Sequence, residues 1–364
     1  MFKWFKKKQS LGLKPLLHDE RDFHVKTLGW SWTLDNQYKP KANRRVLNTF
    51  GIRNQRGLNT CVVESGEVAK EPQENVVLSA SFMASYLKKI GIMDENGTDL
   101  RSFQKALVDV GCAEESVCPS DHTLSWDKFS NQSNLNPNAM ANASKHKAQS
   151  FWKATTRDEI MKGIDEGFIF HTGMMWYSGY NYLKLPFKIK LFDGTVVGGH
   201  AWDIIGYDLN YQNLGECFIC QNSFGESWGD KGKFYISSSE LLPQIKNWGG
   251  YFTLDIPKEL GRWLQDNQGK IIKNESGVTP EEKSKLYILQ GKEKRWIPDE
   301  ATFSSWGFDG VSMIIDNEGY LKQISEGIPL DFWSGKNVLI IKQIIQQRSN
   351  LKPLFKKYFN ELFV

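Results

Sequence analysis

The sequence predicts an α+β protein in which a helical half precedes a half built from β-strands. Early in the chain, apolar residues recur every three or four positions, which is typical of helices, over 61–70, 77–92 and 99–111. Later segments are short and rich in β-branched and aromatic residues, which is typical of strands: 168–178, 187–193, 200–208, 216–223 and 232–238. A further helix is predicted over 157–167, directly before these strands.

Changes in composition divide the 364 residues into five predicted segments. They are an extended N-terminal arm (1–45), a central domain (46–255), a polar linker (256–285), a small β-rich module (286–335) and a C-terminal tail (336–364). Inside the central domain, the stretch 128–147 is rich in Asn and Ser and predicts a surface connection. A chain of this length is expected to hold two or three compact units.

The C-terminal tail contains the clearest amphipathic pattern in the sequence. Seven apolar residues recur there at helical spacing: Leu351, Leu354, Phe355, Tyr358, Phe359, Leu362 and Phe363. Pro353 suits a first helical turn, so the helix is predicted to start near residue 351. We expect its apolar side to dock on this chain, on a protein partner or on a second copy of the chain.

Charge, hydropathy and cysteine content narrow the possible partners. A net charge of +4 is small for this length, so nucleic acid is not expected as a partner. No run approaches the roughly 18 apolar residues of a membrane span, and the start "MFKWFKKKQS" lacks the apolar core of a secretory signal. We therefore expect neither a transmembrane segment nor export. Five cysteines are few and odd in number, which favours free thiols, and the sequence predicts neither a metal site nor a cofactor.

One cysteine, Cys61, occurs together with the other residue types that thiol catalysis needs. Cys61 begins a predicted helix, whose N-terminus favours the thiolate. Acyl transfer also needs a base, a group that orients this base, and donors for an oxyanion. His200 follows two glycines at the start of a predicted strand, and Asn222 can accept a hydrogen bond from its imidazole, with Phe224 nearby to exclude water. Gln55 precedes the cysteine by one short loop and can donate its amide to the oxyanion.

These segments resemble the papain-like cysteine peptidases, and the bacterial and viral members more than the animal ones. "QRGLNTC" resembles the family's glutamine-to-cysteine loop, "GGHAWDIIGYD" its histidine strand and "NSFGESWGDKGKFYI" its asparagine segment. "DERDF" and "NGTDLRSFQKALVDVGCAEESVCP" carry the likeness to the bacterial and viral branch. The resemblance covers roughly residues 46–255, and a weaker resemblance extends over residues 14–30. It implies the papain-like fold of two subdomains, with the cysteine on the helical half and the histidine and asparagine on the sheet half.

Carried onto this chain, the resemblance implies a thiol peptidase that hydrolyses a polypeptide substrate. The implied roles are nucleophile for Cys61, general base and later acid for His200, orientation of the imidazole for Asn222, and oxyanion donation for Gln55 with the Cys61 N–H. Gly97 and Thr98 would lie along the substrate backbone. Trp228 would form the floor of the cleft on the histidine side.

Around Cys61 the sequence departs from the family pattern. Asn59 and Thr60 stand where the family places a small pair, Val62 follows, and the carboxylate of Glu64 comes one helical turn later, where it would raise the thiol pKa. Two hypotheses stay open: a working thiol peptidase in the cytoplasm, and a papain-fold structural or binding component of a phage particle or bacterial assembly. An amidase that cuts peptidoglycan cross-links is a third, which the segment "NSFGESWG" disfavours.

Overall fold

The computed structural model describes most of the chain. The described residues are 11–15, 19, 22, 24–25, 38–46, 50–255, 263, 266–267, 269–290, 293–327 and 329–330. The chain divides into two compact units, the first built from Met1–His24 and Lys39–Ile256 and the second from Val25–Tyr38 and Pro257–Val364. Within the described residues, no helix combines the length and apolar character needed to span a membrane. The predicted C-terminal helix lies outside the described residues.

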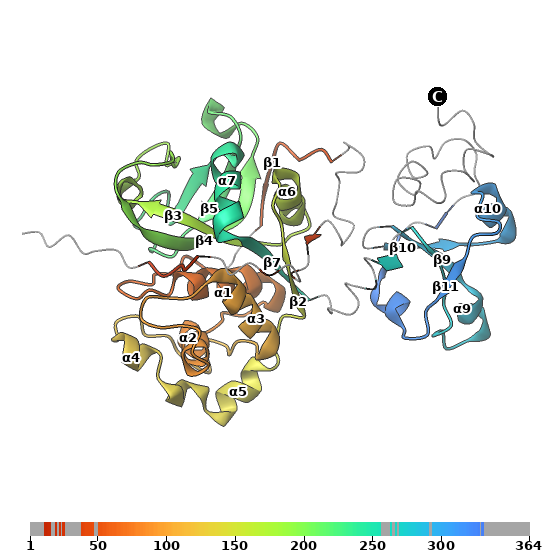
Figure 1. Cartoon of the computed structure of the whole chain (residues 1–364), viewed down its shortest axis with the longest axis horizontal. Helices are drawn as coiled ribbons and strands as arrows, with labels where there is room; N and C mark the ends of the chain where they lie inside the picture. The colour runs from red at the N-terminus through yellow and green to blue at the C-terminus, as the bar shows by residue number, and fades with distance from the viewer. Residues whose placement is uncertain are drawn as a thin grey trace, which may run out of the picture. The chain divides into compact units, whose positions relative to one another are not determined.

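Three helices form the centre of the helical half of the first unit (Figure 1): α1 (Cys61–Glu74), α2 (Ala80–Lys89) and α3 (Leu100–Asp109). They confirm the three early helices that the sequence predicts. The side chains of Ser79 and Asp99 cap α2 and α3, because each accepts a main-chain N–H of the first turn. Gly66 lets α1 and α3 approach closely, since a Cβ there would lie 2.1 Å from the ring of Phe103.

The connection 128–147, predicted as a surface segment, is largely helical. It includes the end of α4 (Trp126–Phe129), the 3-10 helix η3 (Gln132–Leu135) and α5 (Pro137–Ala143). Asn131 and Asn136 accept first-turn N–H groups and so act as helix caps. Most of these residues are exposed or half-buried, as a surface connection requires, but the sequence did not predict the short helices, because asparagines that read as loop formers start them here.

A seven-stranded antiparallel sheet forms the other half of the first unit. In spatial order the strands are β2 (Ser150–Lys153), β7 (Gly250–Leu254), β3 (Phe170–Tyr177), β4 (Val196–Asp208), β5 (Cys217–Gln221) and β6 (Lys233–Ile236), and β1 (Asn43–Arg45) pairs with the end of β4. Four of these, β3 to β6, confirm predicted strands. β1 comes from the end of the predicted N-terminal arm, whereas β2 and β7 were not predicted.

The predicted strand 187–193 is wrong. Only Lys188 forms a β-bridge there, to Tyr235, and no strand follows. Phe187 and Phe192 have φ values of 56° and 63°, which lie in the left-handed region. A β-strand needs negative φ, so the backbone at these two residues cannot continue the strand that the apolar alternation suggested.

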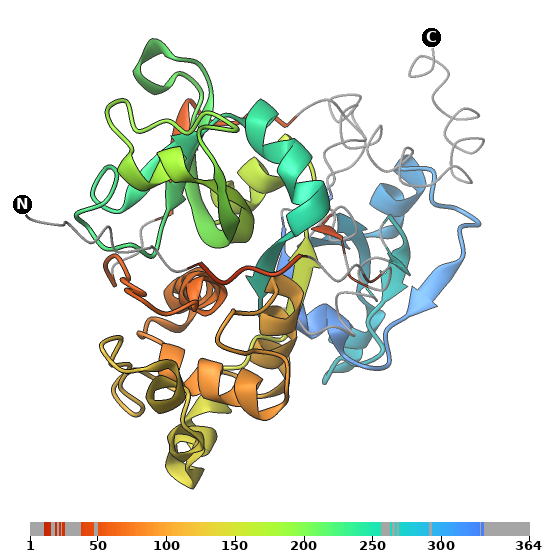
Figure 2. The ribbon, with the colours of Figure 1, turned by 60° about the vertical axis from the view of Figure 1, so that its left-hand side comes forward.

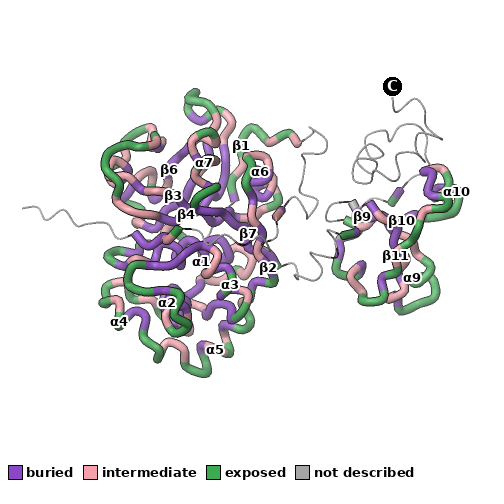
Figure 3. The backbone as a smooth tube through the Cα atoms, in the orientation of Figure 1, coloured by how far each residue is buried: buried purple, intermediate pink, exposed green. Residues whose placement is uncertain are grey.

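Two helices pack on the sheet, α6 (Arg157–Asp165) on β3 and β4, and α7 (Ser238–Trp248) on β3. α6 confirms a predicted helix and begins at a capping box formed by Thr156 and Glu159. On the helical side, α1 packs against β4, and its residues are buried from Cys61 to Glu71 (Figure 3). The two halves of the first unit therefore meet along α1 and β4.

The second unit contains a five-stranded sheet. Its strands, in order, are β11 (Met313–Ile315), β8 (Ile271–Lys273), β9 (Leu286–Gln290), β10 (Glu293–Ile297) and β12 (Ser325–Glu326). Among the described residues, they are accompanied by the short helices α9 (Pro280–Ser284), α10 (Glu300–Ser305) and η6 (Tyr320–Gln323). β8 and α9 come from 256–285, the segment predicted as a linker, so part of that segment belongs to the folded module. Trp306, Phe308 and Leu321 lie in its core.

Candidate active site

Cys61 is the first residue of α1 and is fully buried. A helix N-terminus presents unpaired N–H groups and the positive end of the helix dipole, which stabilise a thiolate. From the sheet side, the main-chain N–H of Ala201 donates to the Cys61 sulfur across 3.3 Å. The thiol therefore lies where α1 meets β4. Its hydrogen-bond donor, Ala201, is the residue that follows His200 in the chain.

His200 and Asn222 form the second part of the site. Nε2 of His200 lies 2.7 Å from Oδ1 of Asn222, which also accepts the N–H of Ser223 at 2.8 Å. Because an amide oxygen only accepts, Nε2 carries the proton and Nδ1 is left as the basic nitrogen. Among the described residues, Nδ1 is buried and has no hydrogen-bond partner. The imidazole is thus held in the tautomer that a general base needs.

Burial keeps both reacting groups neutral in this conformation. It raises the pKa of the Cys61 thiol to about 12, although the N–H groups of Ala201 and Val62 oppose the shift. It also lowers the pKa of His200 to about 4, against the opposing effect of the bond to Asn222. Entry of water would relax both shifts in the direction of a thiolate and an imidazolium.

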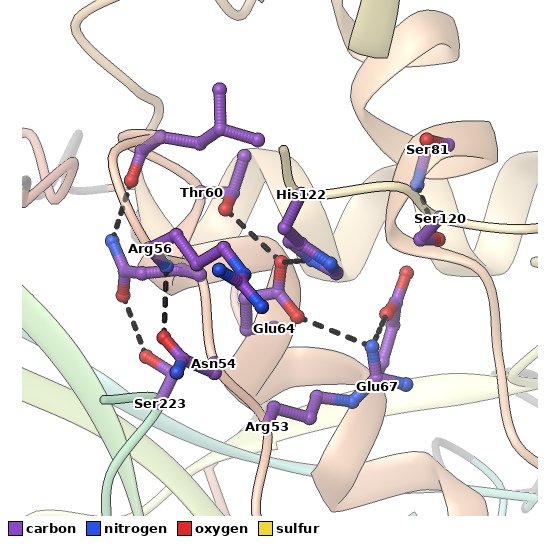
Figure 4. Close-up of polar contacts among 12 residues, drawn as sticks. Arg53, Asn54, Arg56, Thr60, Glu64, Glu67, Ser81, Ser120, His122 and Ser223 are labelled. Carbon is purple, nitrogen blue, oxygen red and sulfur yellow. Dashed lines mark hydrogen bonds and ion pairs between the residues drawn. The ribbon is translucent and has the colours of Figure 1, made fainter. Parts of the chain in front are cut away.

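Both the oxygen and the nitrogen of the Gln55 side-chain amide form hydrogen bonds close to this site. Its Oε1 accepts from the Ser223 hydroxyl at 2.6 Å, and its Nε2 donates to the carbonyl of Leu58 at 2.7 Å. Its main-chain N–H also donates to the carbonyl of Ser223. Ser223 therefore joins the loop before Cys61 to the segment that carries Asn222 (Figure 4), although no pattern in the sequence singles it out.

Aromatic rings enclose the imidazole. Phe224 stacks on the His200 ring with centroids 4.6 Å apart, and Trp176 meets the same ring edge-on at 4.6 Å. Trp228 contacts Phe224 at 5.5 Å and donates its indole N–H to the carbonyl of Tyr180. Trp176 was missed from the sequence, although alternation along β3 points it to the same face as Met174, which pairs with His200.

Gly97 and Thr98 lie opposite Gly199, but the space between them is filled by residues 11–15. The N–H of Thr98 donates to the carbonyl of Gly12 at 2.9 Å, and the N–H of Lys14 donates to the carbonyl of Thr98 at 2.9 Å. On the other side, the N–H of Leu13 donates to the carbonyl of Gly199 at 3.1 Å. Figure 2 shows this red segment running between the helical half and the sheet half. We call residues 11–15 the covering segment.

Ion pairs are formed by the covering segment and by the residues that follow it. Lys14 pairs with Asp94 at 3.0 Å. Further along the chain, Arg101 of α3 binds Asp19 and Asp22, each at 2.8 Å. The predicted arm thus contributes at least these segments to the folded first unit.

The described residues contain no group of three or more His, Cys, Asp or Glu side chains that could bind a metal. All five cysteines are free thiols and are buried. Cys217 and Cys220 lie on β5, where Cys220 donates only to the carbonyl of Phe218.

Comparison with known proteins identifies the fold. No protein-family model matches the chain, and no curated protein matches it. The crystal structure of xylellain, a cysteine protease from Xylella fastidiosa, matches with a TM-score of 0.56 and 18% identity, over 68% of this chain and 97% of that one. The chain has the fold of the papain-like cysteine proteases.

Other solved structures with the papain-like fold match less closely. Digestive procathepsin L 3 from the larval midgut of Tenebrio molitor gives a TM-score of 0.47 at 13% identity, covering 60% of this chain and 71% of that one. The proform of Amb a 11, a ragweed pollen cysteine protease, gives 0.46 at 15% identity, covering 61% and 68%. The likeness to xylellain, at 18% identity, shows the fold alone.

Proposed function

We propose that this protein is a thiol peptidase that hydrolyses peptide bonds of a polypeptide substrate. The observation that carries the proposal is that β4, the strand that carries His200, contacts the sulfur of Cys61 through the residue next to His200. The Ala201 N–H donates to this sulfur, and the neighbouring His200 is fixed by Asn222 in the tautomer with a basic Nδ1. A buried thiol without a catalytic role has no need of an oriented imidazole beside it.

In the proposed reaction, Nδ1 of His200 takes the thiol proton and the Cys61 sulfur attacks the carbonyl carbon of the scissile bond. The oxyanion formed accepts hydrogen bonds from the Cys61 N–H and the Gln55 amide. The imidazolium then gives its proton to the leaving amine, which leaves an acyl-enzyme thioester. Water, deprotonated by the same nitrogen, attacks the thioester, releases the carboxylic acid and restores the thiol.

Main-chain groups on either side of Cys61 support an extended peptide as the substrate. The N–H and carbonyl of Thr98 and the carbonyl of Gly199 all bond to the main chain of the covering segment. A substrate main chain would pair with the same groups, as an added β-strand does. We therefore propose that the covering segment and the substrate compete, and that the described conformation is the blocked one.

Further assignments belong to the same proposal. Residues 46–255 would form the peptidase domain, and 286–335 an accessory module. A relationship to bacterial or viral members and a location in the cytoplasm or a phage particle rest on the sequence resemblance. Docking of a partner or a second copy on the predicted C-terminal helix rests on the sequence pattern from Leu351 to Phe363.

A second candidate is a papain-fold component of a phage particle or bacterial assembly that does not turn over substrate. It is favoured by the covered state of the site, because Cys61 has no exposed surface and the chain's own residues occupy the flanking main-chain groups. In this case the covering segment would be a permanent part of the structure. Replacing Cys61 would then leave the function of the protein unchanged.

Cleavage of a mixed library of unstructured peptides, read by mass spectrometry, separates the two candidates. The full-length chain, a Gly12→Ala variant that disturbs the covering segment, Cys61→Ala and Cys220→Ser would be compared. The peptidase proposal predicts new peptide ends with the first two and with Cys220→Ser, which changes a buried thiol on β5, and none with Cys61→Ala. No cleavage by any form would contradict the proposal.

A further inference from the structure

The buried carboxylate of Glu64 lies near the start of α1, one helical turn after Thr60, which directly precedes Cys61. Glu64 is fully buried and belongs to the first turn of α1. Its Oε1 accepts from the Thr60 hydroxyl at 3.0 Å and lies 2.7 Å from Nε2 of His122. Its Oε2 accepts from Arg53 at 3.2 Å. Figure 4 shows Glu64 between these three partners.

The bond from Thr60 to Glu64 changes how α1 begins. Thr60 is the N-cap residue, and a threonine there commonly accepts an N–H of the first turn. In this chain its side chain makes no capping bond, and its hydroxyl donates to Glu64. The first N–H groups of α1 are therefore not consumed by a cap. These are the groups that the proposed thiolate and oxyanion need.

The position of Glu64 also has an electrostatic consequence for Cys61. A nearby negative charge disfavours the thiolate, and Glu64 contributes in this direction to the raised thiol pKa. Arg53 is shared, since it also pairs with Glu67 at 2.8 Å and with Glu71. One guanidinium thus faces three carboxylates of the same helix. His122 is the second cationic group that contacts Glu64.

We propose that His122 is a positioning residue of the Cys61 site, which in its protonated form holds Glu64 against Thr60 and offsets the negative charge of Glu64 near the thiol. The proposal rests on the proposed thiol chemistry and adds a residue that does not touch the substrate. It also gives the departure at Glu64 a role. The carboxylate is compatible with a reactive Cys61 as long as His122 carries its proton.

The groups around His122 determine the direction of its pH dependence. Burial lowers its pKa, but the charge and hydrogen bond of Glu64 outweigh burial and leave the pKa raised; Arg53 opposes the shift and Glu115 supports it. Asp121 is the neighbouring charged residue in sequence. As pH rises through the raised pKa, His122 loses its charge while Glu64 keeps its own. The Cys61 thiolate is then disfavoured, so removal of the His122 charge should move thiol ionisation to higher pH.

His122 is accessible to protons from solvent. Its side chain is 18% exposed, whereas that of Glu64 is fully buried. It lines a cavity of about 520 Å³ together with the loop before Cys61 and residues Glu95 and Asn96. Asn59 joins these two loops by donating to the carbonyl of Glu95 at 2.7 Å. Protonation of His122 can therefore follow the bulk pH while its partner stays buried.

The test measures the alkylation rate of Cys61 by iodoacetamide between pH 5 and 10, with peptide mass mapping. It uses the full-length chain carrying Gly12→Ala, so that the covering segment is disturbed in every sample. His122→Gln keeps a donor to Glu64 without the charge, and His122→Phe removes both. His146→Gln is the matched control, because His146 pairs with Glu74 and Glu114 and does not contact the loop before Cys61.

We expect the alkylation rate of Cys61 at the acidic end of the range, where His122 is charged, to fall by about threefold or more in His122→Gln, and further in His122→Phe, with no change in His146→Gln. At the alkaline end, where His122 is neutral, His122→Gln should match the parent. An unchanged rate at the acidic end in His122→Gln overturns the proposal, as does a profile without alkylation of Cys61 in any variant. Alkylation needs no substrate. A shifted profile without peptide cleavage would therefore support the role of His122 while contradicting the peptidase function.

Discussion

Gly97 and Gly12 touch through their main chains. A Cβ added to Gly97 would lie 1.8 Å from the carbonyl oxygen of Gly12, and a Cβ added to Gly12 would lie 2.1 Å from the carbonyl oxygen of Asn59. Gly97 also has φ of 99°, which side chains rarely adopt. The covering segment therefore fits between the two halves only because glycine stands at both positions.

Replacing Gly12 by Ala should open the site. The added methyl would meet main-chain atoms of Asn59, which cannot move as a flexible side chain can, so the covering segment has to shift. We expect peptide cleavage to rise by about tenfold or more, equivalent to roughly 1.4 kcal/mol in favour of the open form. Lys14→Ala removes only an exposed ion pair with Asp94 and should change cleavage by less than about twofold. Equal cleavage rates for both variants would refute the blocking role.

Replacing Gln55 by Ala should lower turnover by about 100-fold or more, the usual effect of losing one oxyanion donor. The substitution also removes the bonds of this buried amide to Ser223 and Leu58, so some stability is lost as well, and turnover is compared at a temperature where both forms are folded. Gln73→Ala is the control, since Gln73 of α1 bonds to the carbonyl of Thr253 away from the site. Steady-state kinetics and thermal unfolding measure both effects. Wild-type turnover in Gln55→Ala would remove Gln55 from the site.

Replacing Asn222 by Ala should lower kcat by roughly 100-fold and leave KM nearly unchanged. The imidazole of His200 would lose the acceptor at 2.7 Å that fixes its tautomer, whereas the groups facing the peptide main chain remain. Asn134→Ala is a suitable comparison, because Asn134 bonds to Ser85 and Phe129 in the helical half. An equal loss of kcat in both variants would show that the effect is general destabilisation.

The sequence predicted the parts of the site that share a local pattern. The loop before Cys61 and the segments of His200 and Asn222 each carry their residue type in a recognisable local context. Papain-like architecture followed from them, and the fold is confirmed. The bond between His200 and Asn222 joins residues that are close in sequence and lie on β4 and directly after β5, which are neighbouring strands. The sequence motifs around His200 and Asn222 were therefore enough to predict that the two side chains lie together.

Other features depend on contacts between distant residues. The contact between His122 and Glu64 could not be predicted, because the two residues are 58 positions apart in the sequence and lie on different elements. The covering segment was read as part of an extended arm, since the main-chain bonds of Gly12 and Leu13 have no sequence signature. The short helices after Trp126 were missed because Asn serves equally in loops and in caps.

Stability should fall as pH is lowered below about 6.5, the ordinary histidine value. Burial lowers the pKa of His171 to about 3 and that of His200 to about 4. Between these values and about 6.5, the unfolded chain binds protons that the folded chain does not, so protonation favours unfolding. His171→Leu removes one such group, and its Tm should fall less steeply between pH 6.5 and 4 than that of the unmodified chain. Parallel Tm curves would contradict the assignment of His171 as a buried neutral imidazole.

Covalent labelling of Cys61 tests the central claim most directly. A peptide carrying an epoxide or chloromethylketone group would be incubated with the full-length chain, with Gly12→Ala and with His200→Ala in the Gly12→Ala background, and all five cysteines would be mapped by mass spectrometry. We expect labelling at Cys61 alone, faster in Gly12→Ala and lost when His200 is also replaced. Slow labelling spread equally over several cysteines, or labelling of Cys61 that is indifferent to His200, would contradict it.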